Sequence, residues 1–265
     1  DGLCTIEDYI NNLVPREQHT DLYRSLETLF GQALPYLEAV YSYVRAVRKQ
    51  FREEEEAEWM SQLEPLDLQP VSLRGQKLQV ITKIVDYELQ PDQTYEGVWH
   101  VEGMSHEEIV CTCLYILHRD ESLEGGELEF KRAFFKDEAD YIYSSVGQIR
   151  HPNLEALIGE GLVPLGTVET LQGRLIVFPN SHVHRVKTIL GKKGNVKTKR
   201  RIVVFFVVNP LKRIVSTREV STPQQEYAGG TMKHEDALAH RLALMKERKY
   251  KKQDWNVREI ELCEH

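Results

Sequence analysis

From about Leu78 to Ile214 the chain holds six runs rich in β-branched and aromatic residues, with no amphipathic helix between them. The runs are KLQVITKIVDYEL (77–89), EEIVCTCLYIL (107–117), GELEFKRAFF (126–135), GTVETLQGRLIVF (166–178), HVHRVKTIL (182–190) and RRIVVFFVV (200–208). Gly125, Gly126, Gly173 and the polar stretch 191–199 separate them with turn signals. Parallel sheets need a crossover helix between successive strands, so this order predicts an antiparallel sandwich or barrel.

Helical periodicity appears on either side of this β region. Residues 21–30 and 35–60 carry apolar residues at a spacing of three to four, and Pro35 fits the first turn of the second of two helices. One face of that helix would carry Leu37, Val40, Tyr41, Val44 and Val47. Helical spacing returns at 232–253. We therefore expect a mainly β, α+β chain that forms one structural domain from three parts: a helical N-terminal region (1–75) packed on the core, a β core (76–222) and a C-terminal helical extension (223–265).

Composition limits the possible binding partners of the protein and its cellular compartment. The hydrophobic share of 41% and charged share of 28% are typical of globular proteins. A net charge of −7 argues against nucleic acid as the main partner. No apolar run reaches the roughly 20 residues that cross a bilayer, so no membrane partner is expected. Cys111 and Cys113 lie two apart in a strand and are expected to be buried thiols, which fits a reducing, intracellular compartment, cytoplasmic or nuclear.

Two His-x-acid triplets are candidates for metal binding. His100 precedes Glu102, and His118 precedes Asp120, each with one residue between. Side chains at positions i and i+2 of a strand share a face, so either pair can present an imidazole and a carboxylate together. Two imidazoles and one carboxylate form the ligand set of non-haem Fe(II) oxygenases. The second imidazole would come from a later strand, where the stretch 182–184 offers two histidines.

The position of each triplet distinguishes them. His100 and Glu102 lie in a turn-rich stretch between two β runs, where the rim of a barrel presents ligands. His118 and Asp120 end a strand and lead into the polar turn ESLEGG, which is typical of a solvated hairpin connection. We therefore predict that His100 and Glu102 carry the chemistry.

The ordered motifs YEGVWHVEG, EEIVCTCLYILHRDESLEGGELEF, GRLIVFPNSHVHRV and RRIVVFFVV resemble the core of the Fe(II)/2-oxoglutarate-dependent dioxygenases, in the order found in prolyl hydroxylases. LQVITKI, WHVEGM, GTVETLQGRLIVFPN, HRV and STREVSTPQQ further resemble an uncharacterised domain family best known from fungi. The resemblance runs from about Leu29 to Gln225. It implies a double-stranded β-helix, a cupin-like jelly roll, with helices packed outside.

The same resemblance implies the metal ligands. His100, Glu102 and His184 would be the catalytic residues that hold Fe(II), with a structural or supporting role for His182. Glu102 is a departure, because most of the superfamily has Asp at this position. Trp99, next to a ligand, is expected to help exclude water, and Phe206 to do so or to pack in the core.

The cosubstrate residues are implied in the same way. Arg200 matches the basic residue that pairs with the distal carboxylate of 2-oxoglutarate, and Arg201 is its rival by one residue of strand register. Sixteen residues separate His184 from Arg200, more than usual. Thr112 matches a hydroxyl that holds the same carboxylate, whereas Ile116 stands where related enzymes have a tyrosine. Two residues of the preceding strand are expected to help complete the pocket or to pack beside it: Lys83 and Tyr87.

The implied function is an Fe(II)/2-oxoglutarate-dependent oxygenase. It would use dioxygen to hydroxylate an unactivated C–H bond of an unidentified small molecule or peptide side chain, with release of succinate and CO2. Two alternatives stay open on the same fold. One is a metal-binding cupin-type protein without oxygenase activity, and the other is a non-catalytic interaction module.

Overall fold

The structure is a computed structural model, and it describes residues 4–53, 69–133, 161–191, 197–220, 232–250 and 261–262 of the 265-residue chain. Its helices are η1 (Arg16–His19), α1 (Thr20–Glu53), η2 (Ser105–Glu107) and α4 (His234–Tyr250). Its strands are β1 (Val80–Leu89), β2 (Thr94–Tyr95), β3 (His100–Val101), β4 (Ile109–Arg119), β5 (Leu123–Gly125), β6 (Leu128–Ala133), β7 (Leu162–Val168), β8 (Leu175–Pro179), β9 (His182–Val186), β10 (Ile189–Gly191), β11 (Thr198–Val208) and β12 (Glu261–Leu262).

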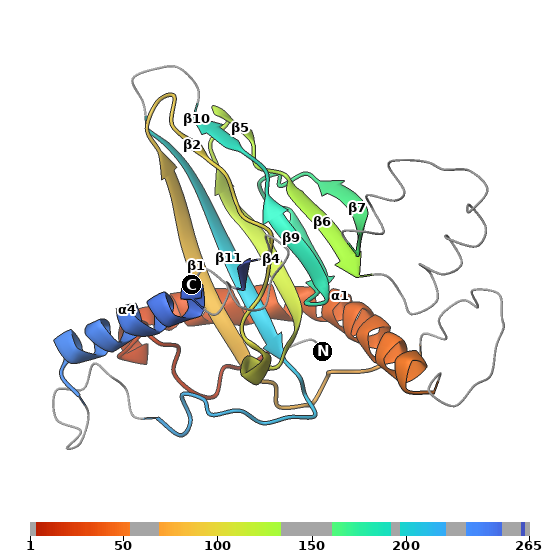
Figure 1. Ribbon diagram of the computed structural model, residues 1–265. Helices are drawn as coiled ribbons and strands as arrows, with labels where there is room; N and C mark the ends of the chain where they lie inside the picture. Colours follow the sequence, from red (N-terminus) through yellow and green to blue (C-terminus); the bar gives the residue numbers. More distant parts are fainter. Residues whose placement is uncertain are drawn as a thin grey trace, which may run out of the picture.

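The strands form a jelly roll (Figure 1). One sheet has the order β1-β11-β4-β8, the facing sheet has the order β12-β3-β9-β6-β7, and a short sheet β2-β10-β5 continues the second. Apart from β12, which runs parallel to β3, the paired strands are antiparallel. When β2–β3, β5–β6 and β9–β10 are each read as one bent strand, the chain passes from one sheet to the other at every connection from β1 to β11 except the hairpin β6–β7. The predicted double-stranded β-helix is therefore confirmed.

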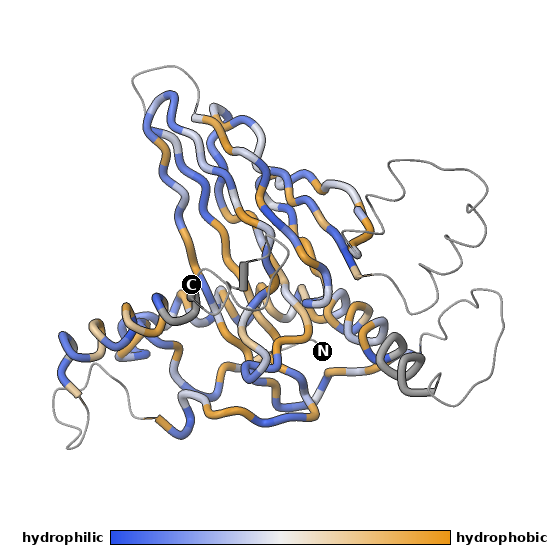
Figure 2. The backbone as a smooth tube through the Cα atoms, in the orientation of Figure 1, coloured by the Kyte–Doolittle hydropathy of each residue, from blue (hydrophilic) through white to orange (hydrophobic). Residues whose placement is uncertain are grey.

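Two apolar layers lie on opposite faces of the four-stranded sheet. Alternate residues of β11 separate them, as the twofold periodicity of a strand requires. Phe205 points towards α1, where its ring lies 5.3 Å from that of Phe30, edge to face. Phe206 points into the jelly roll, in a core that also holds Phe130 and Phe178. Figure 2 shows the apolar stretches of the central strands where they pass α1. The inner layer holds the candidate site.

The prediction of two N-terminal helices divided at Pro35 is wrong, because α1 runs from Thr20 to Glu53 without interruption. Proline lacks an N–H and its ring crowds the carbonyl four residues earlier, a cost of about 3 kcal/mol in a helix interior. Here that earlier residue is Gly31, and Pro35 itself is exposed. The buried side of α1 offsets the cost, since Ala33, Leu34 and Leu37 lie in the core between helix and sheet. Tertiary packing therefore overrides the local break.

The remaining fold predictions have mixed outcomes. The run 166–178 divides into parts of two strands, β7 and β8, because a turn at Gly173 intervenes. The C-terminal helix is present as α4, and its leucines are exposed: Leu238, Leu242 and Leu244. Cys111 and Cys113 are buried thiols in the core beside α1. In the described part of the chain, no helix is both long enough and apolar enough to cross a membrane. The predicted boundary at 222/223 and the side chain of Val47 lie outside what the structure describes.

Candidate metal centre

His100, Glu102 and His184 converge inside the jelly roll. Glu102 Oε1 lies 3.3 Å from Nε2 of His184 and 3.8 Å from Nε2 of His100. One ligand atom from each residue falls within 4.8 Å of the others, and this is the only such group of potential metal ligands among the described residues. His100 and His184 are direct neighbours across β3 and β9, with ring centroids 4.4 Å apart. The structure therefore brings together two imidazoles from paired strands and one carboxylate from the bend after β3.

Backbone contacts leave Nε2 of both imidazoles available to a metal. His100 Nδ1 lies 2.8 Å from the carbonyl of Val98, and His184 Nδ1 lies 3.2 Å from the carbonyl of His182. A carbonyl only accepts hydrogen bonds, so each Nδ1 carries a proton, and each Nε2 is the nitrogen that faces Glu102 Oε1 and could face a metal. Such carbonyl contacts hold the tautomer and ring orientation of metal-binding histidines. Burial lowers the pKa of His100, but the hydrogen bond and negative charge of Glu102 outweigh burial, and the net pKa is raised.

Asn180 fixes the backbone at Glu102, a role that sequence analysis missed. The backbone N–H of Glu102 donates to Asn180 Oδ1 at 2.8 Å, and Asn180 Nδ2 donates to the carbonyl of Glu102 at 2.8 Å and to that of Ile109 at 3.1 Å. The only sequence signal was an Asn in the turn PNS, a common turn residue. Phe178 and Phe130 pack against the His184 ring at centroid distances of 4.7 and 5.9 Å. These contacts hold two of the three candidate ligands rigidly.

Arg200 and Thr112 lie in the same interior with polar atoms that have no hydrogen-bond partner among the described residues. Arg200 is fully buried, and its Nη1 donates to the carbonyl of Gly126 at 3.1 Å. Its Nε and Nη2 are buried without a partner, and so is Oγ1 of Thr112. Burial lowers the pKa of Arg200 to about 10, so the guanidinium is charged at neutral pH. Unpaired buried charges are costly, so these donors favour an anionic ligand.

Tyr87 connects the arginine with the His-Glu-His group. It pairs with Arg200 across β1 and β11, and the Arg200 guanidinium carbon lies 5.7 Å from its ring centre. Burial raises the pKa of Tyr87 to about 12; the Glu102 charge adds to this, whereas Arg200 opposes it. Lys83 lies four residue pairs further along β1, and its charge opposes the rise in the pKa of His100. Ile116 is fully buried in the inner core, and the tyrosines beside Arg200 come from β1 and β2: Tyr87 and Tyr95, with ring centres 5.0 Å apart.

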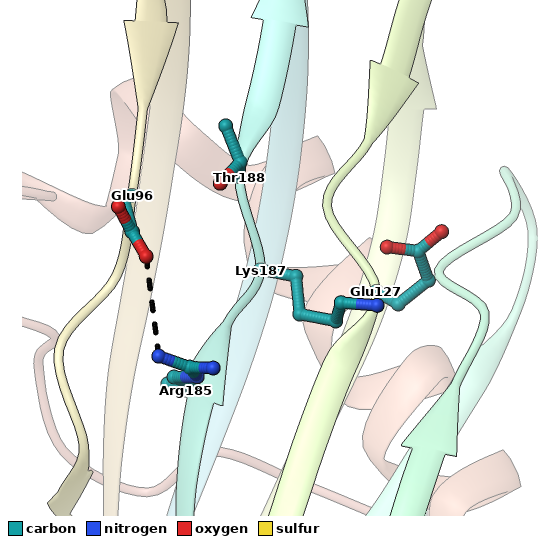
Figure 3. Close-up of a pocket in the computed structure, with 5 residues that line it drawn as sticks. All are labelled: Glu96, Glu127, Arg185, Lys187 and Thr188. Atoms are coloured by element: carbon teal, nitrogen blue, oxygen red, sulfur yellow. Dashed lines mark ion pairs between the residues drawn. The ribbon is translucent and has the colours of Figure 1, made fainter.

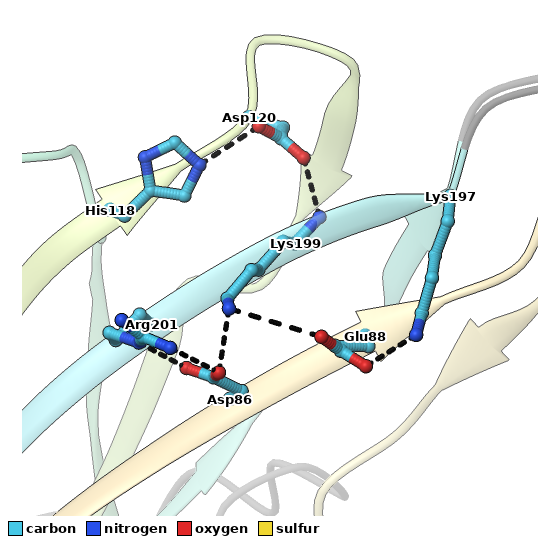
Figure 4. Close-up of polar contacts among 7 residues, drawn as sticks. All are labelled: Asp86, Glu88, His118, Asp120, Lys197, Lys199 and Arg201. Atoms are coloured by element: carbon cyan, nitrogen blue, oxygen red, sulfur yellow. Dashed lines mark hydrogen bonds and ion pairs between the residues drawn. The ribbon is translucent and has the colours of Figure 1, made fainter.

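The rival candidates lie on the outer face of the four-stranded sheet (Figure 4). Arg201 forms two hydrogen bonds with Asp86, as strand alternation requires once Arg200 points inward. His118 Nε2 is 2.9 Å from Asp120 Oδ1, and Asp120 Oδ2 accepts the backbone N–H of Lys199 at 2.6 Å. Both side chains of this triplet are substantially exposed, at 44% and 33%. They form a solvated hairpin contact, as expected.

Three other expectations concern side chains near the ligands. The ring centre of His182 lies 6.2 Å from that of Tyr43 on α1, and burial lowers the pKa of His182 to about 4. Phe206 is buried in the inner core. Trp99 does not line the site; Lys131 and Arg185 stack on its ring, each 4.7 Å from its centre. Trp99 directly precedes His100, and the alternation of strand side chains would have predicted its outward position.

A cavity of about 270 Å³ lies elsewhere, lined by Glu96, Glu127, Arg185, Lys187 and Thr188 (Figure 3). Arg185 follows His184 in β9 and so points to the other face of the sheet. Arg185 is 2.8 Å from Glu129 and 3.9 Å from Glu96, so acidic neighbours already pair its charge. The candidate site is therefore the inner one.

Fold and site together define a jelly-roll protein with a two-histidine, one-carboxylate cluster of metal-binding type in its interior. The chain belongs to the family described as "Protein of unknown function (DUF4246)", whose pattern it matches over residues 1–230. No curated protein matches it.

Solved structures with some similarity include two prolyl 4-hydroxylase structures. The Pseudomonas putida enzyme shares 15% identity at a TM-score of 0.28, over 50% of this chain and 55% of its own. The Phytophthora capsici structure shares 14% identity at a TM-score of 0.29, over 66% of this chain and 45% of its own. A cupin protein from Desulfovibrio desulfuricans shares 15% identity at a TM-score of 0.18, over 55% of this chain and 96% of its own. This chain therefore spans about half of the two hydroxylase structures.

Proposed function

We propose that this protein is an Fe(II)/2-oxoglutarate-dependent oxygenase that hydroxylates a C–H bond of a small molecule or peptide side chain. The observation that carries the proposal is Arg200: a fully buried guanidinium with two unpartnered nitrogens, in the same interior as a His-Glu-His cluster. A cupin-type metal site or an interaction module has no use for such a group. An oxygenase needs it, because a keto diacid that chelates the metal carries a second carboxylate to be held.

The cluster fits a divalent metal ion by the chemistry of its donors. Two neutral imidazoles and one carboxylate form the set that leaves coordination positions open on non-haem iron. Ligand atoms bonded at about 2.1 Å and roughly at right angles lie some 3 Å apart, close to the 3.3 and 3.8 Å seen here. The carbonyls of Val98 and His182 already set the tautomers, so the rings need little rearrangement. His100, Glu102 and His184 would hold the ion.

The protein's own residues would bind and orient the reactants. Bound iron supplies the activation of dioxygen that the oxidation requires. Arg200 would hold the distal carboxylate of 2-oxoglutarate, beside the ring of Tyr87. Thr112 pairs with Phe206, six residues or about 20 Å along β11 from Arg200, and so is too far away to share that carboxylate. The packed rings of Phe130 and Phe178 exclude water from one side of His184. The overall balance is 2-oxoglutarate, dioxygen and R–H giving succinate, CO2 and R–OH.

The test needs no knowledge of the prime substrate. Purified protein is incubated with Fe(II), 2-oxoglutarate and ascorbate as reductant, and succinate is measured by mass spectrometry. We expect slow succinate formation that requires iron, because dioxygen reaches chelated iron even without substrate. Glu102→Ala should abolish it, Glu102→Asp should retain part of it, and His118→Ala should match the wild type. If metal and 2-oxoglutarate bind but no succinate forms, even with diverse candidate substrates added, the oxygenase proposal is wrong.

A further inference from the structure

A β-bulge at the end of β4 places a second arginine beside Arg200. Along most of the β4–β11 ladder the pairing is regular, with Ile202 opposite Ile116, but Arg201 is opposite His118 and Arg200 opposite Arg119. Leu117 is therefore an extra residue in β4. An extra residue exchanges the two faces of a strand beyond it. Without the bulge His118 would point inward; with it, Arg119 does.

Arg119 and Arg200 meet at one corner of the backbone. Arg119 Nη2 donates to the carbonyls of Leu123 and Gly125, at 3.1 and 2.8 Å, while Arg200 Nη1 donates to the carbonyl of Gly126. Gly126 has φ +79°, and a Cβ there would lie 3.0 Å from Arg200 Nη1. The Gly-Gly pair, a turn signal in the sequence, thus also accepts hydrogen bonds from both guanidinium groups through its carbonyls.

Three nitrogens of this pair have no acceptor among the described residues. They are Arg119 Nη1, Arg200 Nε and Arg200 Nη2, all buried. No carboxylate of the described residues forms an ion pair with either arginine. The charge of Arg119 also contributes to lowering the pKa of Arg200, so the two guanidinium groups repel each other. Like charges directly opposite in a sheet are destabilising. An anion between them would remove the repulsion and satisfy the donors together.

We propose that Arg119 and Arg200 bind one anionic group together, as a two-arginine subsite for the distal carboxylate of a dicarboxylic keto acid. The inference rests on the proposed function and deepens it, because it assigns a second specificity-determining residue for the cosubstrate. The subsite distinguishes keto acids by whether they carry a distal carboxylate. A diacid gains both guanidinium groups, whereas a keto monoacid, which chelates the metal in the same way, gains neither.

Calorimetric titration of Mn(II)-loaded protein tests this without turnover. The two ligands are 2-oxoglutarate and 2-oxobutanoate, which lacks the distal carboxylate. Arg119→Met should weaken 2-oxoglutarate binding about tenfold or more, as expected for a lost charge-assisted hydrogen bond, and leave 2-oxobutanoate binding unchanged. Arg174→Met is the matched control, since Arg174 is partly exposed and near Glu169 at the surface, and it should bind both as the wild type does. Arg119→Gln keeps a donor for the Gly125 carbonyl without the charge. If Arg119→Met does not fold, Arg119→Gln should also bind 2-oxoglutarate more weakly and 2-oxobutanoate as the wild type does.

The possible outcomes are distinct. If Arg119→Met or Arg119→Gln binds 2-oxoglutarate like the wild type, or loses both ligands equally, Arg119 only supports the β5 backbone and the inference is overturned while the proposed function stands. If the wild type binds neither keto acid, the proposed function itself fails and the inference with it.

Discussion

Arg201 donates from Nε and Nη2 to the two carboxylate oxygens of Asp86, at 2.5 and 2.6 Å, on the outer face of the four-stranded sheet (Figure 4). Its neighbour Arg200 is fully buried on the inner face. One residue of register thus separates a solvated ion pair from an interior guanidinium. The β1–β11 pairing of Asp86 with Arg201 and of Tyr87 with Arg200 sets that register.

Arg200→Ala should sharply weaken binding of 2-oxoglutarate to the Mn(II)-loaded protein. Loss of a buried, hydrogen-bonded partner of a charged group costs roughly 2–5 kcal/mol, so the dissociation constant should rise by more than about tenfold. Metal affinity should change little. Arg201→Ala is the matched control and should bind like the wild type in the same calorimetric titration. A reversed pattern for the two variants would mean that the outer arginine holds the cosubstrate.

His184→Ala and His100→Ala should each abolish stoichiometric binding of Fe(II) or Mn(II). Each variant keeps only one imidazole and one carboxylate as protein ligands, and two such ligands hold these ions weakly. Metal content after anaerobic loading and desalting is the measurement. The control is the double variant His118→Ala with Asp120→Ala, which removes the exposed triplet and should retain the metal. Loss of metal from that double variant alone would assign the site to the hairpin.

Pro35→Ala should stabilise the protein. Alanine restores an N–H for the Gly31 carbonyl in the middle of α1 and removes the crowding, a gain of about 1–3 kcal/mol after allowing for the greater freedom of the unfolded chain. The free energy of unfolding from urea denaturation measures it. Gln32→Ala, at an exposed position of the same helix, is the control and should change it little. No gain at Pro35 would show that the helix is adapted to the proline.

Asp86→Asn should lower stability at neutral pH and matter less in acid. The hydrogen bond from Arg201 and the contact with Lys199 hold the pKa of Asp86 well below its ordinary value. A carboxyl group whose pKa is lower in the folded state contributes stability that is complete above its unfolded pKa, near 3.9, and is lost as pH falls towards the folded value. The difference in urea midpoint between wild type and variant should therefore shrink from pH 6 to pH 2. A constant difference would point to packing instead of charge.

The antiparallel sandwich and the two His-x-acid candidates were predictable from short-range patterns, whereas the jelly-roll topology and the choice of His184 as the third ligand came from the resemblance to the dioxygenases. Twofold alternation and the absence of crossover helices define the sheets, and a histidine two positions from an acid is visible in any strand. Sequence could not show that Leu117 is extra in β4, because one inserted residue leaves no compositional mark; only pairing with β11 reveals it. Pro35 shows the converse, a clear local signal that packing overrides.

The candidate metal ligands and the anion-binding residues lie on different sheets. His100 and His184 come from β3 and β9, whereas Arg119 and Arg200 come from β4 and β11. A cosubstrate held at both ends would therefore act as a removable crosslink between the two halves of the sandwich. Binding of the cosubstrate would restrain local opening of the two sheets, so their amide hydrogens should exchange more slowly. Under the proposed function, departure of the shortened product would release that restraint once in each turnover, and the rigidity of the barrel would follow the occupancy of the cosubstrate site.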